Sequence, residues 1–168
     1  MIAETKLLIL DHQQVIQKVR RIGFEIFENN VKEKSIVLAG IDGQGYQLAK
    51  MLATVVEDIS PLKTDLIKVL LNKEDPTKSE VTVDQDAKVY KRKSIILVDD
   101  VLNSGRTLAY AMKPFLEVEI RKLEVAVLVN RSHPKFPIQP TYTGYELATT
   151  LTDHVEVVLG KKSSVYLK

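Results

Sequence analysis

The residues best suited to chemistry lie in one segment, Ile95–Thr107. An apolar run is followed by two adjacent carboxylates, Asp99 and Asp100, and then by the small polar turn Asn103–Thr107, which we expect to open a helix. In an open α/β sheet, ligands bind beyond the carboxyl ends of the strands, which is where this order places the carboxylates and the turn. The segment therefore predicts a ligand site.

The two halves of this segment suit different parts of a ligand. The backbone N–H groups of Asn103–Thr107, at the start of a helix, favour an anion, and Gly105 allows close backbone approach. Asp99 and Asp100 repel an anion, so they suit hydroxyl groups, a metal ion or developing positive charge. A sugar phosphate satisfies both halves, although either half alone is equally well explained by an ordinary turn with a capped helix.

A second loop, Gly40–Gly45, follows another apolar run. Glycine makes up only 7 of the 168 residues, or about 4%, whereas its usual share is about 7%. Three of these seven glycines nevertheless lie in this loop. Glycines tolerate unusual dihedral angles and let backbone amides point at phosphate oxygens. A plain strand-to-helix turn explains this loop by itself, but its pairing with Ile95–Thr107 favours an anion site.

Composition excludes several classes of protein. With 168 residues, 45% of them apolar, the chain is expected to form one globular domain over residues 1–168, and fibrous or disordered classes are excluded. The absence of cysteine excludes disulfides, thiolate zinc sites and cysteine nucleophiles. The early apolar run Leu7–Leu10 is too short for a signal-peptide core, and no run approaches the ~20 residues of a membrane span. We therefore expect a cytoplasmic protein with no membrane partner.

Short apolar runs alternate with segments of helical period, which predicts an α/β fold with a mainly parallel central sheet. Helices are expected from Asp11, as N-cap, to about Asn29, and from about Leu48 to a point before Pro61. A third is expected from about Thr107, with Pro114 kinking or ending it. The expected strands are Leu7–Leu10, Ile36–Ala39, Asp65–Leu71, Ser94–Val98, Leu123–Val129, Val155–Leu159 and Ser164–Leu167.

The whole segment Ile95–Thr107 resembles the phosphoribosyl-diphosphate motif of the type I phosphoribosyltransferases, an apolar strand followed by Asp-Asp and a Thr/Ser-Gly-x-Thr turn. Within that superfamily the chain is most similar to the bifunctional pyrimidine operon regulator/uracil phosphoribosyltransferases. The resemblance implies the type I phosphoribosyltransferase fold, a central mainly parallel sheet flanked by helices with a small hood. The stretches that carry it are Val37–Ile41, Gly45, Leu48–Lys50, Val98–Leu102, Ser104–Thr107, Val127–Arg131, His133, Pro137–Ile138, Tyr142 and Gly144.

The resemblance also implies roles for individual residues. Asp99 and Asp100 would hold the ribose hydroxyls as catalytic carboxylates, the turn after them would wrap the 5-phosphate, and the glycine loop would face the pyrophosphate, where such loops often hold a cis peptide. The implied phosphoribosyl-diphosphate-binding residues are Ile41, Asp42, Gly43, Gln44, Gly45, Val101, Leu102, Asn103, Ser104, Gly105, Arg106 and Thr107.

Two further segments gain roles from the resemblance. Asn72–Ala87 would be a flexible loop that closes over the site, with Lys73 as a catalytic cation that reaches the pyrophosphate; a solvated lysine is the equal alternative. The irregular segment Asn130–Tyr145 would form the hood that selects the base, with Asn130 and Arg131 binding it. A purely structural Arg131 remains the alternative.

The implied activity joins 5-phosphoribosyl 1-diphosphate to a free nucleobase, uracil being expected first, in a Mg²⁺-dependent homodimer. Magnesium would enter with the substrate rather than by direct protein ligation, with Asp99 or Asp100 acting through water. Two other functions stay open: a pyrimidine-responsive RNA-binding attenuation regulator and a non-catalytic phosphoribosyl-diphosphate sensor.

Departures from the family pattern bear on this choice. Gly43-Gln44 stands where the family usually has Thr-Arg, Lys73 stands where it usually has Arg, and Asn130 where it commonly has Asp. The missing loop arginine favours the sensor. A net charge of +2, and a basic cluster at Lys88–Lys93 that leads into a core strand, argue against RNA.

Overall fold

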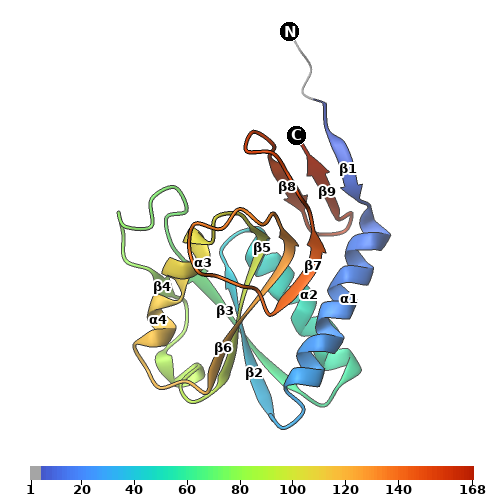
Figure 1. Ribbon diagram of the computed structural model, residues 1–168. Coiled ribbons are helices and arrows are strands. Elements are labelled where there is room, and N and C mark those ends of the chain that lie inside the picture. The colour runs from blue at the N-terminus through green and yellow to red at the C-terminus, as the bar shows by residue number, and fades with distance from the viewer. Residues whose placement is uncertain (1–4) are drawn as a thin grey trace.

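The computed structural model describes residues 5–168, so the first four residues lie outside the description. The described residues form two β-sheets, and helices pack against the larger one (Figure 1). The main sheet has six strands in the order β4-β3-β2-β5-β6-β7, and a small sheet has three in the order β1-β9-β8. The main strands are β2 (Ser35–Ile41), β3 (Lys63–Leu70), β4 (Thr82–Val83), β5 (Ser94–Leu102), β6 (Lys122–Asn130) and β7 (Tyr142–Glu146).

The main sheet is parallel except for the short edge strand β4, which pairs antiparallel with β3. Its central strands are buried on both faces, which is why their sequences read as continuous apolar runs. In β2, Ile36 and Leu38 face one core layer, whereas Val37 and Ala39 face the other. This alternation follows from the pleat of the strand.

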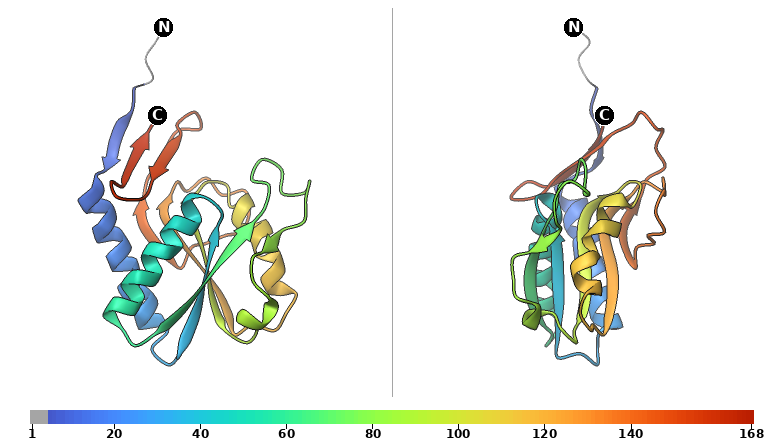
Figure 2. Two further views of the ribbon diagram at one scale, coloured as in Figure 1. Left: turned by 180° about the vertical axis from the view of Figure 1, so that it is seen from behind. Right: turned by 90° about the vertical axis from the view of Figure 1, so that its left-hand side faces the viewer.

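Helices cover both faces of the main sheet (Figure 2). On one side lie α1 (His12–Asn29) and α2 (Gln44–Ile59), and on the other lie α3 (Arg106–Ala111) and α4 (Lys113–Leu116). A 3₁₀ turn, η1 (Ala87–Val89), precedes β5. Within residues 5–168 no helix combines the length and the apolar character needed to cross a membrane.

The predicted helices are confirmed, although α2 begins at Gln44 rather than at about Leu48, and the predicted cap of α1 is confirmed. Asp11 caps α1 in a reciprocal pair with Gln14. Pro114 interrupts the helix after the turn at Asn103–Thr107, which is called the phosphate turn for its predicted role. α3 ends at Ala111 and Pro114 lies in the first turn of α4, where its missing N–H costs nothing.

Two predicted strand ends were wrong. β5 continues through Asp99 and Asp100 to Leu102, since it stays paired with β6 as far as Leu102↔Asn130. β2 likewise includes Gly40 and Ile41, paired with β3, so only residues 42–43 separate it from α2.

The small sheet, which we call the hood, consists of β1 (Leu7–Leu10), β8 (Val155–Val158) and β9 (Ser164–Leu167). It brings the two ends of the chain together beyond the carboxyl ends of the main strands (Figure 1). The prediction that Asn130–Tyr145 forms the hood is therefore wrong. Residues 142–146 of that region extend the main sheet as β7, because they pair in parallel with β6.

The core on the α3/α4 side offers a direct test of packing. Phe115 is fully buried and meets Tyr90 edge to face at 5.1 Å between ring centres, whereas its neighbour Leu116 is 68% exposed. We expect Phe115→Ala to lower the free energy of unfolding by about 3–5 kcal/mol. We expect Leu116→Ala to change it by less than about 0.5 kcal/mol. Urea unfolding of both variants checks this, and equal losses would contradict the packing.

Candidate active site

The site forms where the carboxyl ends of β2 and β5 meet the start of α2. Gly45, in the first turn of α2, lies so close to β5 that a Cβ there would be 2.9 Å from Asp99 Oδ1 and 2.9 Å from the Val98 carbonyl oxygen. Only glycine therefore permits this helix to touch the strand. The contact explains one of the glycines that the sequence places in this loop.

Asp99 is the most constrained charged residue of the site. Only 4% of it is exposed, and its Oδ1 accepts a hydrogen bond from the Asp100 backbone N–H at 2.9 Å. Burial, and then the neighbouring Asp100 charge, hold the pKa of Asp99 well above its ordinary value, while Lys73, with Nζ 4.0 Å away, opposes this. Such a carboxylate is stabilised by hydroxyl donors or by positive charge brought in by a ligand.

The turn after β5 has the geometry expected of an anion-binding turn. Gly105 adopts a φ of +86°, and α3 starts at the next residue. A cavity of about 40 Å³ is lined by Asp99, Val101 and the continuous stretch 102–108. The predicted carboxylate and the predicted phosphate turn thus face one space, as the sequence implied.

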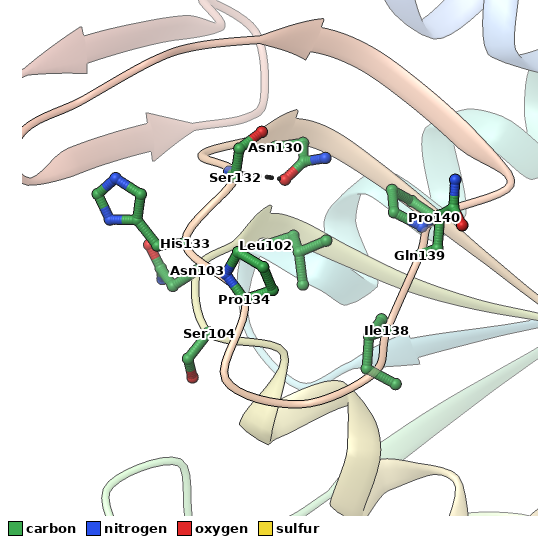
Figure 3. A pocket seen from close by; sticks show the side chains of 10 residues that line it. All are labelled: Leu102, Asn103, Ser104, Asn130, Ser132, His133, Pro134, Ile138, Gln139 and Pro140. Carbon is green, nitrogen blue, oxygen red and sulfur yellow. Dashed lines mark hydrogen bonds between the residues drawn. The ribbon is translucent and has the colours of Figure 1, made fainter.

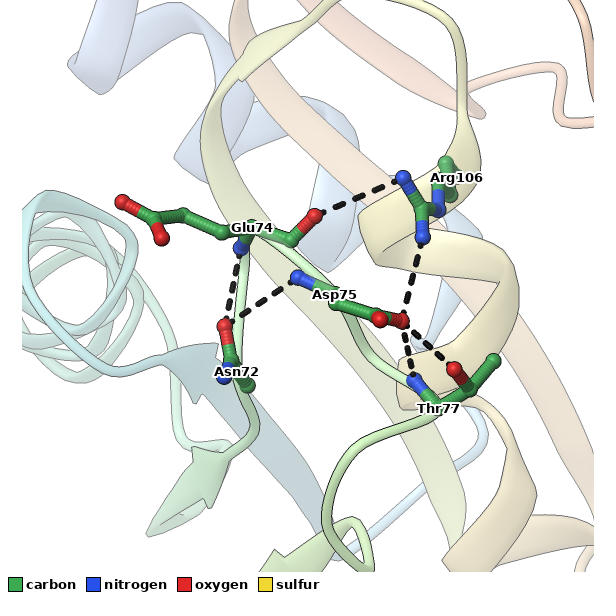
Figure 4. A network of polar contacts seen from close by, with 5 residues as sticks. All are labelled: Asn72, Glu74, Asp75, Thr77 and Arg106. Carbon is green, nitrogen blue, oxygen red and sulfur yellow. Dashed lines mark hydrogen bonds and ion pairs between the residues drawn. The ribbon is translucent and has the colours of Figure 1, made fainter.

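Arg106 is engaged differently from the prediction. Its side chain leaves the turn and donates to Asp75 at 3.4 Å and to the Glu74 carbonyl at 3.5 Å (Figure 4). Asp75 also accepts hydrogen bonds from Thr77, and these, before Arg106, hold the pKa of Asp75 below its ordinary value. Asn72 caps the same loop through the backbone N–H groups of residues 74 and 75.

The loop after β3 consequently lies against the phosphate turn. Lys73 of this loop forms an ion pair with Asp99, and Asp75 forms one with Arg106. These contacts agree with the prediction that the segment lies over the site. The Lys73 side chain is 45% exposed and lies near Asp99, and its contact with pyrophosphate stays a prediction. In this structure the Arg106 guanidinium is therefore held by the loop after β3.

The turn at residues 41–45 is less open to a ligand than expected. Ile41 is fully buried, so only its backbone is available, and the Gly43 N–H donates to the Asp42 carboxylate at 3.0 Å. Gln44 Oε1 accepts a hydrogen bond from the Leu159 N–H at 2.9 Å, which ties α2 to the hood. The contact of this loop, Gln44 included, with pyrophosphate stays a prediction. Among residues 5–168 no peptide bond is cis.

The side chains of the neighbouring residues Asn130 and Arg131 have different surroundings. Asn130 lines a cavity of about 230 Å³ between the 102–104 turn and the 132–140 loop (Figure 3), and its Oδ1 accepts from the Ser132 N–H. Arg131 is 8% exposed, and all its hydrogen bonds go to the protein itself. These contacts agree with the structural alternative for the Arg131 side chain, and base binding by Arg131 stays a prediction.

Sequence reasoning missed two groups of residues. Thr149–Asp153, which connects β7 to the hood, supplies three acceptors to Arg131. Asp75 meets Arg106, 31 residues further along the chain. A hydroxyl-rich turn ending in Asp was the signal for the first group, and the acidic residues after Lys73 were the signal for the second.

Comparison with known families decides what this arrangement is. Residues 8–160 match the family model described as "Phosphoribosyl transferase domain". The chain belongs to the phosphoribosyltransferase family. The type I fold predicted from the Asp99-Asp100 motif is thereby confirmed.

Relatives of this phosphoribosyltransferase domain extend over nearly its full length. A "Bifunctional protein PyrR" from Bacillus pumilus is 36% identical and covers 94% of this chain and 93% of its own. One from Clostridium novyi is 32% identical, with 96% and 94% covered. These similarities agree with the resemblance found in the sequence.

Solved structures show the same fold at lower identity. A hypoxanthine-guanine phosphoribosyltransferase from Bacillus anthracis gives a TM-score of 0.67 at 19% identity, covering 86% of this chain and 84% of that one. A hypoxanthine phosphoribosyltransferase from Trypanosoma cruzi in complex with IMP gives 0.68 at 12%, with 83% and 75% covered.

Asp99→Asn tests the cost of burying this carboxylate. Because the pKa of Asp99 is raised in the folded state, the folded protein binds more protons than the unfolded chain between the two pKa values, and stability falls as pH rises through that window. We expect Asp99→Asn to be more stable at pH 7 by about 1 kcal/mol or more, a gain that disappears below about pH 4. Thermal unfolding across pH measures this, and a variant less stable than the wild type at pH 7 contradicts it.

Asp75→Asn tests the hold of the loop on Arg106. The pair is partly exposed, so its loss frees Arg106 with little effect on stability. We expect the KM for 5-phosphoribosyl 1-diphosphate to fall by about two- to fivefold.

Asp65→Asn is the matched control, since Asp65 pairs with Lys93 at the start of β3, at the opposite edge of the sheet. An unchanged or higher KM in Asp75→Asn would show that this ion pair does not compete with the substrate.

Proposed function

We propose that this chain transfers the phosphoribosyl group of 5-phosphoribosyl 1-diphosphate to a free nucleobase, uracil first among the candidates. The observation that carries the proposal is that Asp99 and the 102–108 turn line one cavity in a member of this family. A phosphate on the turn places the adjoining ribose beside the carboxylates. Uracil is placed first because the sequence resembles the pyrimidine operon regulator/uracil phosphoribosyltransferases, whereas the more distant solved structures are named for purine bases.

Transfer of the phosphoribosyl group is accelerated mainly by positioning of the two reactants and by electrostatic stabilisation of the transition state. The bond from C1 of the ribose to the diphosphate oxygen breaks, and its electron pair leaves with pyrophosphate. A ring nitrogen of the base forms the new C–N bond and loses its proton to the departing pyrophosphate or to water. Asp99 and Asp100 accept hydrogen bonds from the ribose hydroxyls and stabilise positive charge on the sugar in the transition state. Lys73, 4.0 Å from Asp99, lies close enough to follow the departing diphosphate.

Magnesium fits this site as a companion of the substrate. Within residues 5–168 no cluster of three or more acidic or histidine side chains could enclose a metal ion. Mg²⁺ usually keeps several waters and binds substrate phosphates, so Asp99 or Asp100 would hold it through one of those waters. When bound, it would neutralise charge on the diphosphate.

A second function is supported by the name "bifunctional" that the curated relatives carry. For this chain we keep a pyrimidine-responsive RNA-binding regulator as the candidate. The cluster at Lys88–Lys93 gives it little support, since Lys93 pairs with Asp65 at 2.6 Å and Arg92 with Glu119 at 3.7 Å. Filter binding across salt concentrations tests it: sequence-specific affinity supports regulation, and affinity indifferent to RNA sequence opposes it.

Association into a homodimer is part of the proposal and rests on the family resemblance. Sedimentation equilibrium at micromolar concentration tests it. A single species at twice the 18.9 kDa chain mass supports the dimer, and a monomer opposes it.

Nucleotide formation is the decisive assay. Uracil, hypoxanthine, guanine, adenine and orotate are offered side by side with 5-phosphoribosyl 1-diphosphate and Mg²⁺, and we expect uridine monophosphate. Asp100→Asn should lower turnover by about 100-fold, because it removes one of the two charges beside the ribose.

Thermal stabilisation by the substrate without nucleotide from any base would identify a sensor instead. Full turnover in both Asp99→Asn and Asp100→Asn would refute the site.

A further inference from the structure

Arg131 makes a set of contacts that joins two functional parts of the molecule. Its Nη1 donates to Asn103 Oδ1 at 2.8 Å, at the first residue of the phosphate turn. Its Nε donates to Thr149 Oγ1 at 3.0 Å, and its Nη2 to the carbonyl oxygens of Thr150 and Asp153 at 3.3 and 2.6 Å. One buried guanidinium therefore holds both the turn and the connection between β7 and the hood.

The partners of Arg131 explain why the two ends should respond to each other. All four acceptors are uncharged oxygen atoms, and the nearby Asp153 carboxylate is used by the Thr150 N–H at 2.7 Å. A buried cation held by neutral dipoles is stabilised further when an anion arrives close by. Asn103 is the first residue of the phosphate turn, so a phosphate bound to the turn lies near this charge.

The rigid fork of arginine suits this task, because its five donors point in fixed directions. Four of them are used here, one toward the turn and three toward Thr149–Asp153. A second link runs parallel, since His133 Nε2 lies 2.9 Å from the Thr149 carbonyl oxygen. The connection to the hood is thus fixed from the side of β6 and the phosphate turn.

We propose that Arg131 is a positioning residue that couples occupation of the phosphate turn to the order of the Thr149–Asp153 connection, and through it to the hood. The inference rests on the proposed function, because it takes the 103–107 turn as the phosphate site. Binding of the phosphorylated sugar thereby tightens the connection from which the hood strand β8 begins.

Hydrogen exchange with ribose 5-phosphate tests the coupling, because this probe carries no base that could touch the hood itself. In the wild type, the probe should slow amide exchange in both 103–107 and 149–153, by about fivefold or more. In Arg131→Gln, exchange in 103–107 should still slow, whereas exchange in 149–153 should stay within about twofold of its unliganded rate.

Three further variants separate coupling from general damage. Arg121→Gln removes an ion pair with Glu33 of 2.7 Å, far from the turn, and should behave as the wild type. Thr149→Val removes one acceptor and should give an intermediate response. If Arg131→Gln does not fold by circular dichroism, Arg131→Lys replaces it, keeping the charge without the fork, and should also lose the response in 149–153.

The outcomes distinguish the two proposals. Equal slowing of 149–153 in wild type and in the Arg131 variants overturns the coupling and leaves the proposed function intact. No slowing of 103–107 in the wild type overturns the phosphate site, and the coupling with it. Steady-state kinetics give a second test. The coupling predicts that Arg131→Lys raises the KM for the base by a larger factor than it lowers kcat, and the opposite order would contradict it.

Discussion

The site depends on the contact between the first turn of α2 and the end of β5. Gly45 allows the helix to approach the strand to a distance that no other residue tolerates, and this approach buries Asp99. Burial next to Asp100 raises the pKa of Asp99 and leaves a carboxylate that is stabilised by hydroxyl groups and by positive charge. Burying the Asp99 carboxylate therefore destabilises the protein without a ligand, and a ligand that donates hydrogen bonds to it, such as the ribose of a sugar phosphate, offsets this cost.

Around this point, three chain segments meet that are far apart in the sequence. The loop with Lys73 and Asp75 lies against the phosphate turn, Gln44 fastens α2 to the hood, and Arg131 fastens the turn to the β7–β8 connection. The side chains that join the parts are ones to which the sequence assigned direct ligand contacts. In this protein the main sheet, the loop after β3 and the hood are held together by residues that border the site.

Much of the fold and the centre of the site could be predicted from the sequence, for physical reasons. Buried parallel strands produce continuous apolar runs, and Asp11 and Pro114 act locally through caps and missing donors. The Ile95–Thr107 motif is contiguous, so its parts must end up together. The partners of Gln44 and Arg131 could not be predicted, because each lies on a segment brought near only by tertiary packing. The hood was misplaced because strand pairing between the two ends of the chain leaves no local pattern in residues 130–145.

The central claim is that Asp99, Asp100 and the 103–107 turn hold the two parts of one ligand. A crystal structure of the protein with 5-phosphoribosyl 1-diphosphate and Mg²⁺ tests it most directly. We predict the 5-phosphate on the backbone amides of 103–107, the ribose hydroxyls on the two carboxylates, and Arg106 released from Asp75. A ligand found instead in the larger cavity beside the 132–140 loop, with the Asp75–Arg106 pair intact, would contradict the account.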